Sequence, residues 1–427
     1  MIQNITFSVI LILIWCLLWS NIGEEALPPN GSLFNVLLLF VCAYILGRLV
    51  SVIRLPPLLG MLIIGFIFGN SYDLNLNHKL SSILRSIALV VILLRAGLGL
   101  DLKVIRKLSF VCLRLSLIPC CVEAITLCVS TYLLIGFPIK WGLLLGFIVS
   151  GVSSAVVIPE MIALQERQMG IDKGIPTLLM ASASVDNVMA ITGFGVCLGL
   201  VFPSNASVVW NILKGPVEAL TGLVVGTLIG LILWFIPITN ESNDNRIETH
   251  FMRTSLLLLF GLFVVLVSTS LNFAGAGPLG CLVLSVTASL KWRDKGWNQP
   301  IREVLKYLWI VFETLLFVLI GTEVKISDLR GNDLLFAIIA LFIGLIMRSI
   351  VTTLVVFGAD FNVKEKLFIA LSWVPKATVQ AAIGPIALDM ARQRNDPKLE
   401  ELAKFVLNHN NGPFGCDHHI IDCKQMP

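Results

Sequence analysis

The chain has 427 residues, of which 56% are hydrophobic and only 14% are charged, and its formal net charge is +4. A soluble domain carries roughly a quarter charged residues, so this composition excludes an ordinary soluble enzyme, a disordered chain and a disulfide scaffold. Lys and Arg form no basic run interleaved with aromatic residues, so nothing indicates nucleic acid as a partner. The long apolar stretches instead predict an all-α polytopic membrane protein in a lipid bilayer.

About thirteen stretches are apolar enough to be transmembrane helices. In chain order they are Ile5–Ile22, Phe34–Ile53, Leu58–Gly69, Ile83–Leu100, Leu108–Ile135, Trp141–Leu164, Pro176–Phe202, Ala219–Ile238, Ser255–Phe273, Pro278–Leu290, Leu305–Gly321, Leu334–Phe357 and Leu367–Met390. No loop between them is long enough to fold alone. We therefore predict a single transmembrane domain over residues 1–408 and a polar, disordered tail at 409–427. The first stretch lacks the basic start and the cleavage site of a signal peptide, so we predict a retained helix.

Lys and Arg are distributed unevenly between alternate loops. If the N-terminus lies inside, the cytoplasmic loops hold most of these residues, including Lys103, Arg302 and Lys364, and the opposite loops hold few. The positive-inside rule therefore predicts a cytoplasmic N-terminus.

The order of features suggests two repeats, the first at about 33–202 and the second, incomplete, at about 253–408. Each half has a short span that begins with proline and glycine, and later a helix with one buried charge, Glu123 in the first half and Arg348 in the second. Equivalent helices are an odd number of spans apart and so run in opposite directions. Inverted-topology repeats are the architecture of secondary transporters. The alternative is chance similarity among helices rich in Gly and Leu.

Five charged residues inside predicted spans stand out: Glu123, Asp186, Arg348, Lys376 and, nearer an end of its span, Glu313. Placing a charge at mid-bilayer costs about 2.5–3.5 kcal/mol of free energy, so each of these residues is expected to have a charged partner or a function. Asp186 lies near the middle of its span, where a carboxylate can bind a proton or a small dehydrated cation. The alternative is that Asp186 pairs with Arg348 or Lys376 only to hold helices together.

Two spans contain polar residues and proline at their centres. Ser150–Ala155 interrupts the sixth span, and Trp373–Gln380 interrupts the thirteenth. Unwound segments expose backbone carbonyls and helix ends near the midplane, and both suit cation binding. We therefore predict Ser153 and Ser154 as neutral ion ligands, with Lys376 offsetting the negative helix ends. A proline-kinked helix without a function is the alternative in each case.

The segments Ile175–Met180, Ser184–Phe194 and Trp373–Gln380 closely resemble the animal NHA branch of the cation:proton antiporters. The resemblance covers nearly the whole chain up to about Asn408. It implies exchange of Na⁺ or Li⁺ for H⁺, a homodimer, and a fold with a dimer domain and a moving core domain. It also implies a multi-pass protein of the plasma membrane that serves pH homeostasis. The testis-expressed member of the branch points to the sperm flagellum. No cofactor is implied, and no metal beyond the transported ion.

The resemblance assigns functional positions of the family to individual residues of this chain. Asp186 and Asn187 fall on the ion-binding pair of the family. Glu123 and Arg348 fall on core charged residues that pair with each other or with the site, and Lys376 falls on the lysine of the second broken helix. The predicted ion-binding set is therefore Asp186, Asn187, Ser153 and Ser154, with Glu123, Arg348 and Lys376 as charge partners.

The chain departs from the family at two places. The second residue of the pair is usually an acid, whereas Asn187 can offer a carbonyl oxygen but cannot carry a proton. The last core helix, expected to begin near Leu402, gives way to a polar tail, so the predicted fold lacks that helix.

Two hypotheses about function follow. One is a secondary active antiporter in which Asp186 is the shared cation and proton site. The other is a transport-inactive homologue, or a truncated isoform, that regulates or assembles with an active antiporter. Neither is an enzyme, and the chain has no GxSxG, HExxH or P-loop motif.

Overall fold

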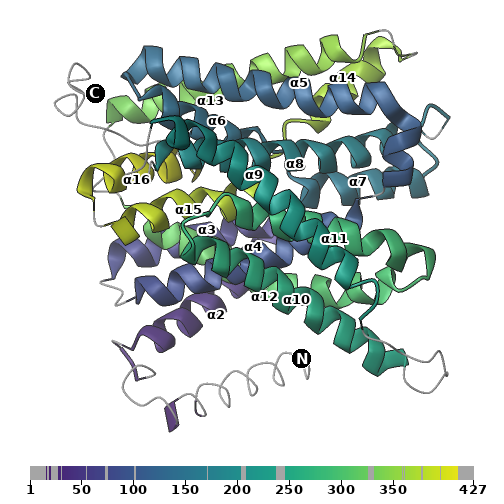
Figure 1. Cartoon of the computed structure of the whole chain (residues 1–427). Coiled ribbons are helices and arrows are strands. Elements are labelled where there is room, and N and C mark those ends of the chain that lie inside the picture. The colour runs from purple at the N-terminus through teal and green to yellow at the C-terminus, as the bar shows by residue number, and fades with distance from the viewer. Residues whose placement is uncertain are drawn as a thin grey trace. The chain divides into compact units, whose positions relative to one another are not determined.

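The computed structural model describes residues 16, 19–20, 27–29, 31–53, 55–72, 76–100, 102–170, 172–202, 208–236, 246–325, 331–357, 359, 361–376, 378–394 and 396–411. Every regular element within these residues is a helix, which confirms the all-α prediction (Figure 1). Eight helices are long and apolar enough to cross a membrane. The predicted first span at 5–22 lies largely outside the described residues, and so do residues 412–427 of the predicted tail.

The helices follow the predicted spans closely. Their bounds are α2 Ser32–Val52, α3 Pro57–Ser71, α4 His78–Gly99, α5 Leu102–Ile135, α6 Ile139–Ser150, α7 Ser154–Glu166, α8 Ile175–Val201, α9 Val208–Ile232, α10 Arg246–Ser270, α11 Ala276–Asp294, α12 Asn298–Glu323, α13 Gly331–Val355, α14 Val363–Ser372, α15 Thr378–Arg394 and α16 Pro397–Asn411. Both predicted breaks are confirmed, because α6 and α7 divide one predicted span and α14 and α15 divide another. The single domain at 1–408 and the inverted repeats stay predictions.

Helix α11 is longer than the sequence predicts. It has 19 residues, and it extends past the apolar run Pro278–Leu290 to Asp294. Lys291 and Arg293 lie in its last turn, where a positive charge interacts favourably with the helix dipole. A hydropathy pattern stops at such residues, although the helix itself continues.

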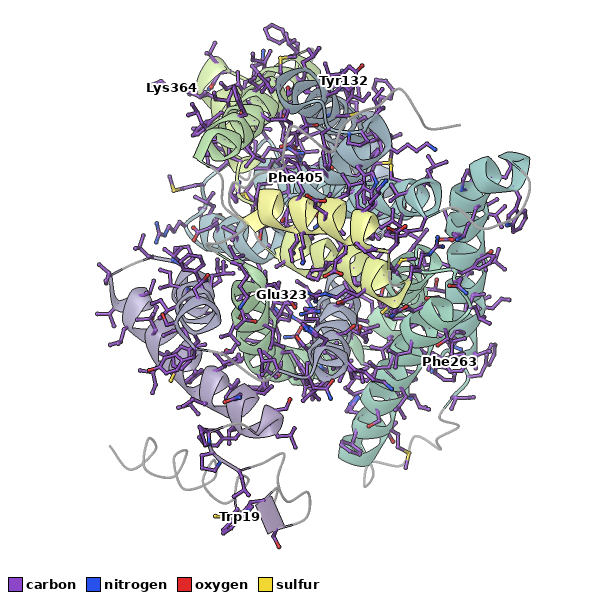
Figure 2. The ribbon with its side chains drawn as sticks, turned by 90° about the vertical axis from the view of Figure 1, so that its left-hand side faces the viewer. Trp19, Tyr132, Phe263, Glu323, Lys364 and Phe405 are labelled. Atoms are coloured by element: carbon purple, nitrogen blue, oxygen red, sulfur yellow. The ribbon has the colours of Figure 1, made fainter. Side chains whose placement is uncertain are left out.

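Helix α16 differs from the prediction that the last helix is missing. It begins at Pro397, and the Asp396 carboxylate caps it by accepting hydrogen bonds from the backbone N–H groups of Lys398 at 3.0 Å and Leu399 at 3.4 Å. Phe405, labelled in Figure 2, is buried, and its ring centroid lies 4.4 Å from that of Phe137. Because α16 is amphipathic, its apolar residues are spaced along one face, and a search for continuous apolar runs misses it.

The chain divides into two compact units, of which the first comprises residues 1–88 and 308–328. Glycines let its helices pack backbone to backbone. A Cβ on Gly65 of α3 would lie only 2.8 Å from the Cα of Gly321 of α12, and a Cβ on Gly69 would lie 2.7 Å from the carbonyl oxygen of Thr322. Small residues at such contacts are typical of membrane helices, where close packing replaces the hydrophobic effect.

The second unit comprises residues 89–307 and 329–427. Within it, α5 packs against α6, α8 and α13, and α8 also packs against α6, α7 and α9. Helices α5 and α13 lie side by side in Figure 1. This packing brings together the three helices that carry Glu123, Asp186 and Arg348.

A capping box starts α14. The Asn362 side chain accepts from the Glu365 N–H at 2.9 Å, and the Glu365 carboxylate accepts from the Asn362 N–H at 2.8 Å. Lys173 Nζ, in the turn before α8, donates to Glu365 Oε2 at 2.8 Å. The hydrogen bonds from Lys173 and Asn362 hold the pKa of Glu365 below its ordinary value. This contact ties the beginning of α14 to the turn that precedes α8.

A buried ion pair lies in α9, where Lys214 Nζ is 3.6 Å from Glu218 Oε1. Glu218 Oε2 also accepts the N–H of Gly275, the residue before α11, at 2.9 Å. We expect Glu218→Gln to lower the free energy of unfolding by about 3–5 kcal/mol, because glutamine still accepts from Gly275 but leaves the Lys214 charge buried and unpaired. Thermal melting of the purified protein measures this loss.

The double variant Lys214→Met with Glu218→Gln is the control for this prediction. It removes the unpaired charge, so it should melt at a higher temperature than Glu218→Gln alone. A double variant that melts no higher would show that the loss does not come from the lysine.

Candidate functional site

The candidate site is built by the middles of three helices. Asp186 lies on α8, Glu123 on α5 and Arg348 on α13. The exposed fraction of both carboxylate residues is 0%, and that of Arg348 is 1%. The turn of α8 before Asp186, Ala181–Ser184, has only small side chains, and all four are buried. Small side chains there allow neighbouring helices to approach the carboxylate closely.

Both oxygens of the Asp186 carboxylate accept hydrogen bonds. Arg348 Nη2 donates to Asp186 Oδ1 at 2.9 Å. The backbone N–H of Val152, inside the break between α6 and α7, donates to Asp186 Oδ2 at 2.9 Å. The unwound backbone therefore supplies a donor that a continuous helix would have used within itself.

Arg348 and Lys376 share two acceptors. Arg348 Nη1 donates to Glu123 Oε2 and to the carbonyl oxygen of Ser150, the last residue of α6. Lys376 Nζ, in the break between α14 and α15, donates to the same two atoms, at 2.8 Å and 2.9 Å. The carbonyl end of α6 carries a partial negative charge, and the two cations neutralise it. Lys376 thus pairs with Glu123, whereas Arg348 bridges Glu123 and Asp186.

The four charges balance. Asp186 and Glu123 contribute −1 each and Arg348 and Lys376 contribute +1 each, so their sum is zero. A buried charge is tolerated when it is paired and hydrogen-bonded, and a balanced set avoids an uncompensated charge at membrane depth. A cation or proton that joins this set therefore changes its formal charge from 0 to +1.

Asn187 differs from its neighbours because its polar atoms are unsatisfied. The side chain is 2% exposed, yet neither Oδ1 nor Nδ2 has a hydrogen-bond partner among the residues that the structure describes. A Cβ on Gly151 would lie 3.4 Å from Asn187 Oδ1, so this oxygen lies directly beside the first break. A buried polar group without a partner costs about 1–3 kcal/mol, which makes the amide oxygen an available ligand.

The structure describes the side chain of only one of the two predicted serine ligands. Ser153 is fully buried in the first break, and its N–H donates to the carbonyl oxygen of Pro375 in the second break at 3.0 Å. This bond joins the two broken helices directly. Ser154 begins α7, and its side chain lies outside the described residues.

Three groups at the site were not assigned from the sequence. Two are backbone atoms, the Val152 N–H and the Ser150 carbonyl oxygen, and no sequence pattern specifies which backbone atom faces a side chain. The third is Gln380, whose Nε2 donates to the carbonyl oxygens of Val149, at 3.1 Å, and Gly151. Its place in the segment Trp373–Gln380 was the signal that could have identified it.

A resident metal is not indicated by side-chain clustering. Among the described residues, no group of three or more His, Cys, Asp or Glu is arranged to hold a metal ion.

An all-α protein with eight span-length helices, two broken helices and a buried, balanced charge cluster between them is an integral multi-pass membrane protein of the secondary transporter class. A family model described as "Sodium/hydrogen exchanger, transmembrane" matches residues 36–398. This protein therefore belongs to the sodium/hydrogen exchanger family, a family of transporters and not of enzymes.

Curated relatives from animals agree with this assignment. The chain is 44% identical to sodium/hydrogen exchanger 9B2 of Mus musculus over 413 residues, which cover 94% of this chain and 74% of the relative. It is 42% identical to sodium/hydrogen exchanger 9B1 of Homo sapiens over 413 residues, 94% of this chain and 78% of the relative. The predicted membership of the animal NHA branch is confirmed.

The fold also matches a solved structure. The sodium proton antiporter MjNhaP1 from Methanocaldococcus jannaschii superposes with a TM-score of 0.71 at 18% sequence identity, over 89% of this chain and 93% of that chain. At this identity the likeness concerns the fold alone.

Proposed function

We propose that this protein exchanges Na⁺ or Li⁺ for H⁺ across a membrane by alternating access, with the Asp186 carboxylate as the site that cation and proton occupy in turn. Membership of the sodium/hydrogen exchanger family supports cation and proton as the exchanged ions. The observation that carries the role of the site is a buried carboxylate next to a buried amide with no partner among the described residues, both facing the break between α6 and α7.

The chemistry requires Arg348 to have two partners. A cation that binds Asp186 must compete with the guanidinium at Oδ1, which lies 2.9 Å away. Arg348 also bonds Glu123, so it keeps a charged partner when the Asp186 carboxylate turns to a cation. Asn187 Oδ1 and the serine oxygens of the break are then the neutral ligands, which suit hard cations such as Na⁺.

The charge balance favours one-for-one exchange. Protonated Asp186 leaves Glu123 at −1 and the two cations at +1 each, a sum of +1. Na⁺ on the ionised carboxylate adds +1 to a sum of zero and also yields +1. The two loaded states therefore have the same formal charge, and the membrane potential, about 2.3 kcal/mol per charge per 100 mV, contributes nothing to a one-for-one cycle.

A specific observation supports the other candidate, a transport-inactive homologue that regulates or assembles with an active antiporter. Both oxygens of Asp186 already accept hydrogen bonds, and the neutral Asn187 leaves no charge deficit for a cation to fill. A carboxylate whose hydrogen bonds and charge are already satisfied gains less free energy when it binds an ion.

Exchange by the purified full chain in proteoliposomes distinguishes the two candidates. An outward Na⁺ gradient should drive proton entry, read by a pH-sensitive dye inside the vesicles, at a rate well above that of protein-free vesicles. Rates at different imposed voltages should be similar. Proton entry no faster than in empty vesicles, for both Na⁺ and Li⁺, would favour the inactive homologue.

Further properties of the proposal follow from the resemblance to the animal branch. We propose a homodimer in the plasma membrane with a cytoplasmic N-terminus, and, by likeness to the testis-expressed member, residence in the sperm flagellum and a role in pH homeostasis. Mass determination in detergent tests the dimer, and antibody labelling of intact and permeabilised sperm tests the membrane and its sidedness.

A further inference from the structure

Gln380 connects the second broken helix to the first. It lies in the first turn of α15, and only 4% of it is exposed. Its Nε2 donates to the carbonyl oxygen of Val149 at 3.1 Å and to the carbonyl oxygen of Gly151. The last carbonyl groups of an α-helix have no partner within that helix. At the end of α6, Gln380 therefore supplies donors to two such groups from a distant segment of the chain.

The peptide group between Gly151 and Val152 makes hydrogen bonds on both sides. Its carbonyl oxygen accepts from Gln380, and its N–H donates to Asp186 Oδ2 at 2.9 Å. A trans peptide is planar, and its C=O and N–H point in opposite directions. The group that holds the carbonyl therefore also sets the direction of the N–H. Gln380 and Asp186 act on one rigid unit from opposite sides.

The orientation of this peptide depends on such a contact. Glycine has no Cβ, so the backbone torsion of Gly151 that turns the next peptide is less restricted than in other residues. A Cβ on Gly151 would lie 3.3 Å from Val379 Cγ1 and 3.4 Å from Asn187 Oδ1, so the glycine lies between α15 and α8. A peptide turned by half a rotation would present its carbonyl oxygen to the Asp186 carboxylate, and two negatively polarised oxygens would then face each other.

An uncharged donor suits this position. The carbonyl between the two that Gln380 holds, that of Ser150, already accepts from Arg348 and Lys376. The formal charges of the cluster already sum to zero. The amide of Gln380 supplies two N–H donors and leaves this sum unchanged. Its bond to the carbonyl also strengthens the N–H of the same peptide as a donor, because linked hydrogen bonds polarise one another.

We propose that Gln380 is a positioning residue of the ion site, which holds the 151–152 peptide so that the Val152 N–H fixes Asp186 Oδ2. The fixed carboxylate then offers Oδ1 to the cation, beside Asn187 Oδ1. Ligands that are held in place before binding raise affinity, and rigid ligands discriminate between ions of different size, such as Na⁺ and Li⁺. The effect on ion affinity rests on the proposed function, whereas the hold on Asp186 does not.

Gln380→Met tests the effect on the ion site in proteoliposomes, because methionine has a similar length and no hydrogen-bond donor. The apparent KM for Na⁺ should rise about tenfold, the effect of one charge-assisted hydrogen bond. The ratio of the KM values for Li⁺ and Na⁺ should move toward one. The maximal rate per folded protein should change by less than about twofold, because the reacting carboxylate is still present. A merely structural loss would lower that rate and leave KM and the ratio unchanged.

Gln165→Met is the matched control. Gln165 Nε2 donates to Thr177 Oγ1 at 3.1 Å, so this amide also connects two helices, α7 and α8. The same exchange of residue types should therefore lower the melting temperature, but it should leave the KM for Na⁺ and the ion ratio as in the parent.

A cycle of melting temperatures tests the hold on Asp186 without any transport. Gln380→Met and Asp186→Asn are measured singly and together in Na⁺-free buffer. Both changes act on one chain of hydrogen bonds, so the loss in the double variant should be smaller than the sum of the two single losses. Gln165→Met combined with Asp186→Asn should give additive losses.

Two results would overturn the proposal. One is additive losses for Gln380→Met and Asp186→Asn. The other is a parent that transports and a Gln380→Met variant with the same KM and ion ratio. A parent without flux, together with losses that are not additive, would refute the proposed function and keep Gln380 as the residue that positions Asp186.

Discussion

Replacement of Asp186 by asparagine is expected to abolish Na⁺-driven proton flux in proteoliposomes. Asparagine has nearly the same shape but only one acceptor oxygen, so it can replace one of the two oxygens that accept from Arg348 and from the Val152 N–H, while its NH2 group faces the other donor. It cannot release a proton, and it offers a cation no charge. The variant cluster has a fixed formal charge of +1, from Glu123, Arg348 and Lys376, and therefore repels a cation.

The flux per folded protein and the effect of Na⁺ on melting separate this role from a structural one. Asp186→Asn should melt below the parent under either role, because it leaves an uncompensated buried charge. If Asp186 only holds helices together, flux should fall only with the amount of folded protein. If Asp186 binds the ion, the flux of the folded variant should be lost, and added Na⁺ should stabilise the parent and not the variant.

Asp396→Asn is the matched control. It makes the same chemical change at the cap of α16, where asparagine caps as well as aspartate does, and it should transport like the parent. Flux through Asp186→Asn equal to that of the parent would rule out the mechanism.

The second large effect is expected from Asn187→Asp, which should raise the apparent affinity for Na⁺ by at least about tenfold. The added carboxylate changes the formal charge of the empty site from 0 to −1, so that one cation neutralises it. Asn187 has no partner among the described residues, so the new charge loses no existing hydrogen bond. Initial rates of proton flux at a series of Na⁺ concentrations measure the change.

The same variant should also make exchange depend on voltage. Two carboxylates can carry two protons against one cation, and each cycle then moves one net charge, worth about 2.3 kcal/mol per 100 mV. The parent, with one acid at the pair, should respond little to an imposed potential.

Asn362→Asp is the matched control here, because it exchanges the same residue types at the cap of α14. If Asn187→Asp changed neither affinity nor voltage dependence, Asn187 would lie outside the ion site. If it gave exchange to a parent that has none, the inactive homologue would be the correct description of the parent.

The placement of the buried charges that form the candidate site could be predicted because charges are scarce in this chain. Asp186, Glu123 and Arg348 each interrupt a long apolar span, and a charge at membrane depth requires a partner or a function. The breaks could be predicted because Pro375 disfavours a helical residue before it, and because the segment beginning Ser150-Gly151 is a weak helix former. Which buried acid pairs with which buried cation could not be predicted from the sequence. Both cations were equally plausible partners of Asp186, and only the structure assigns Lys376 to Glu123 and Arg348 to both acids.

Composition and the spacing of apolar residues alone determined that this is an all-α membrane protein, where most of its helices run, and that Glu123, Asp186 and Arg348 are among its buried charges. These properties are local, since each depends on the free energy of placing one segment in lipid. Only the tertiary structure decided which backbone atoms meet the Asp186 carboxylate, that Asn187 is buried without a partner among the described residues, and that α16 is a helix. Those properties depend on contacts between segments far apart in the chain, and the alternation of apolar and polar residues along one segment carries no information about them.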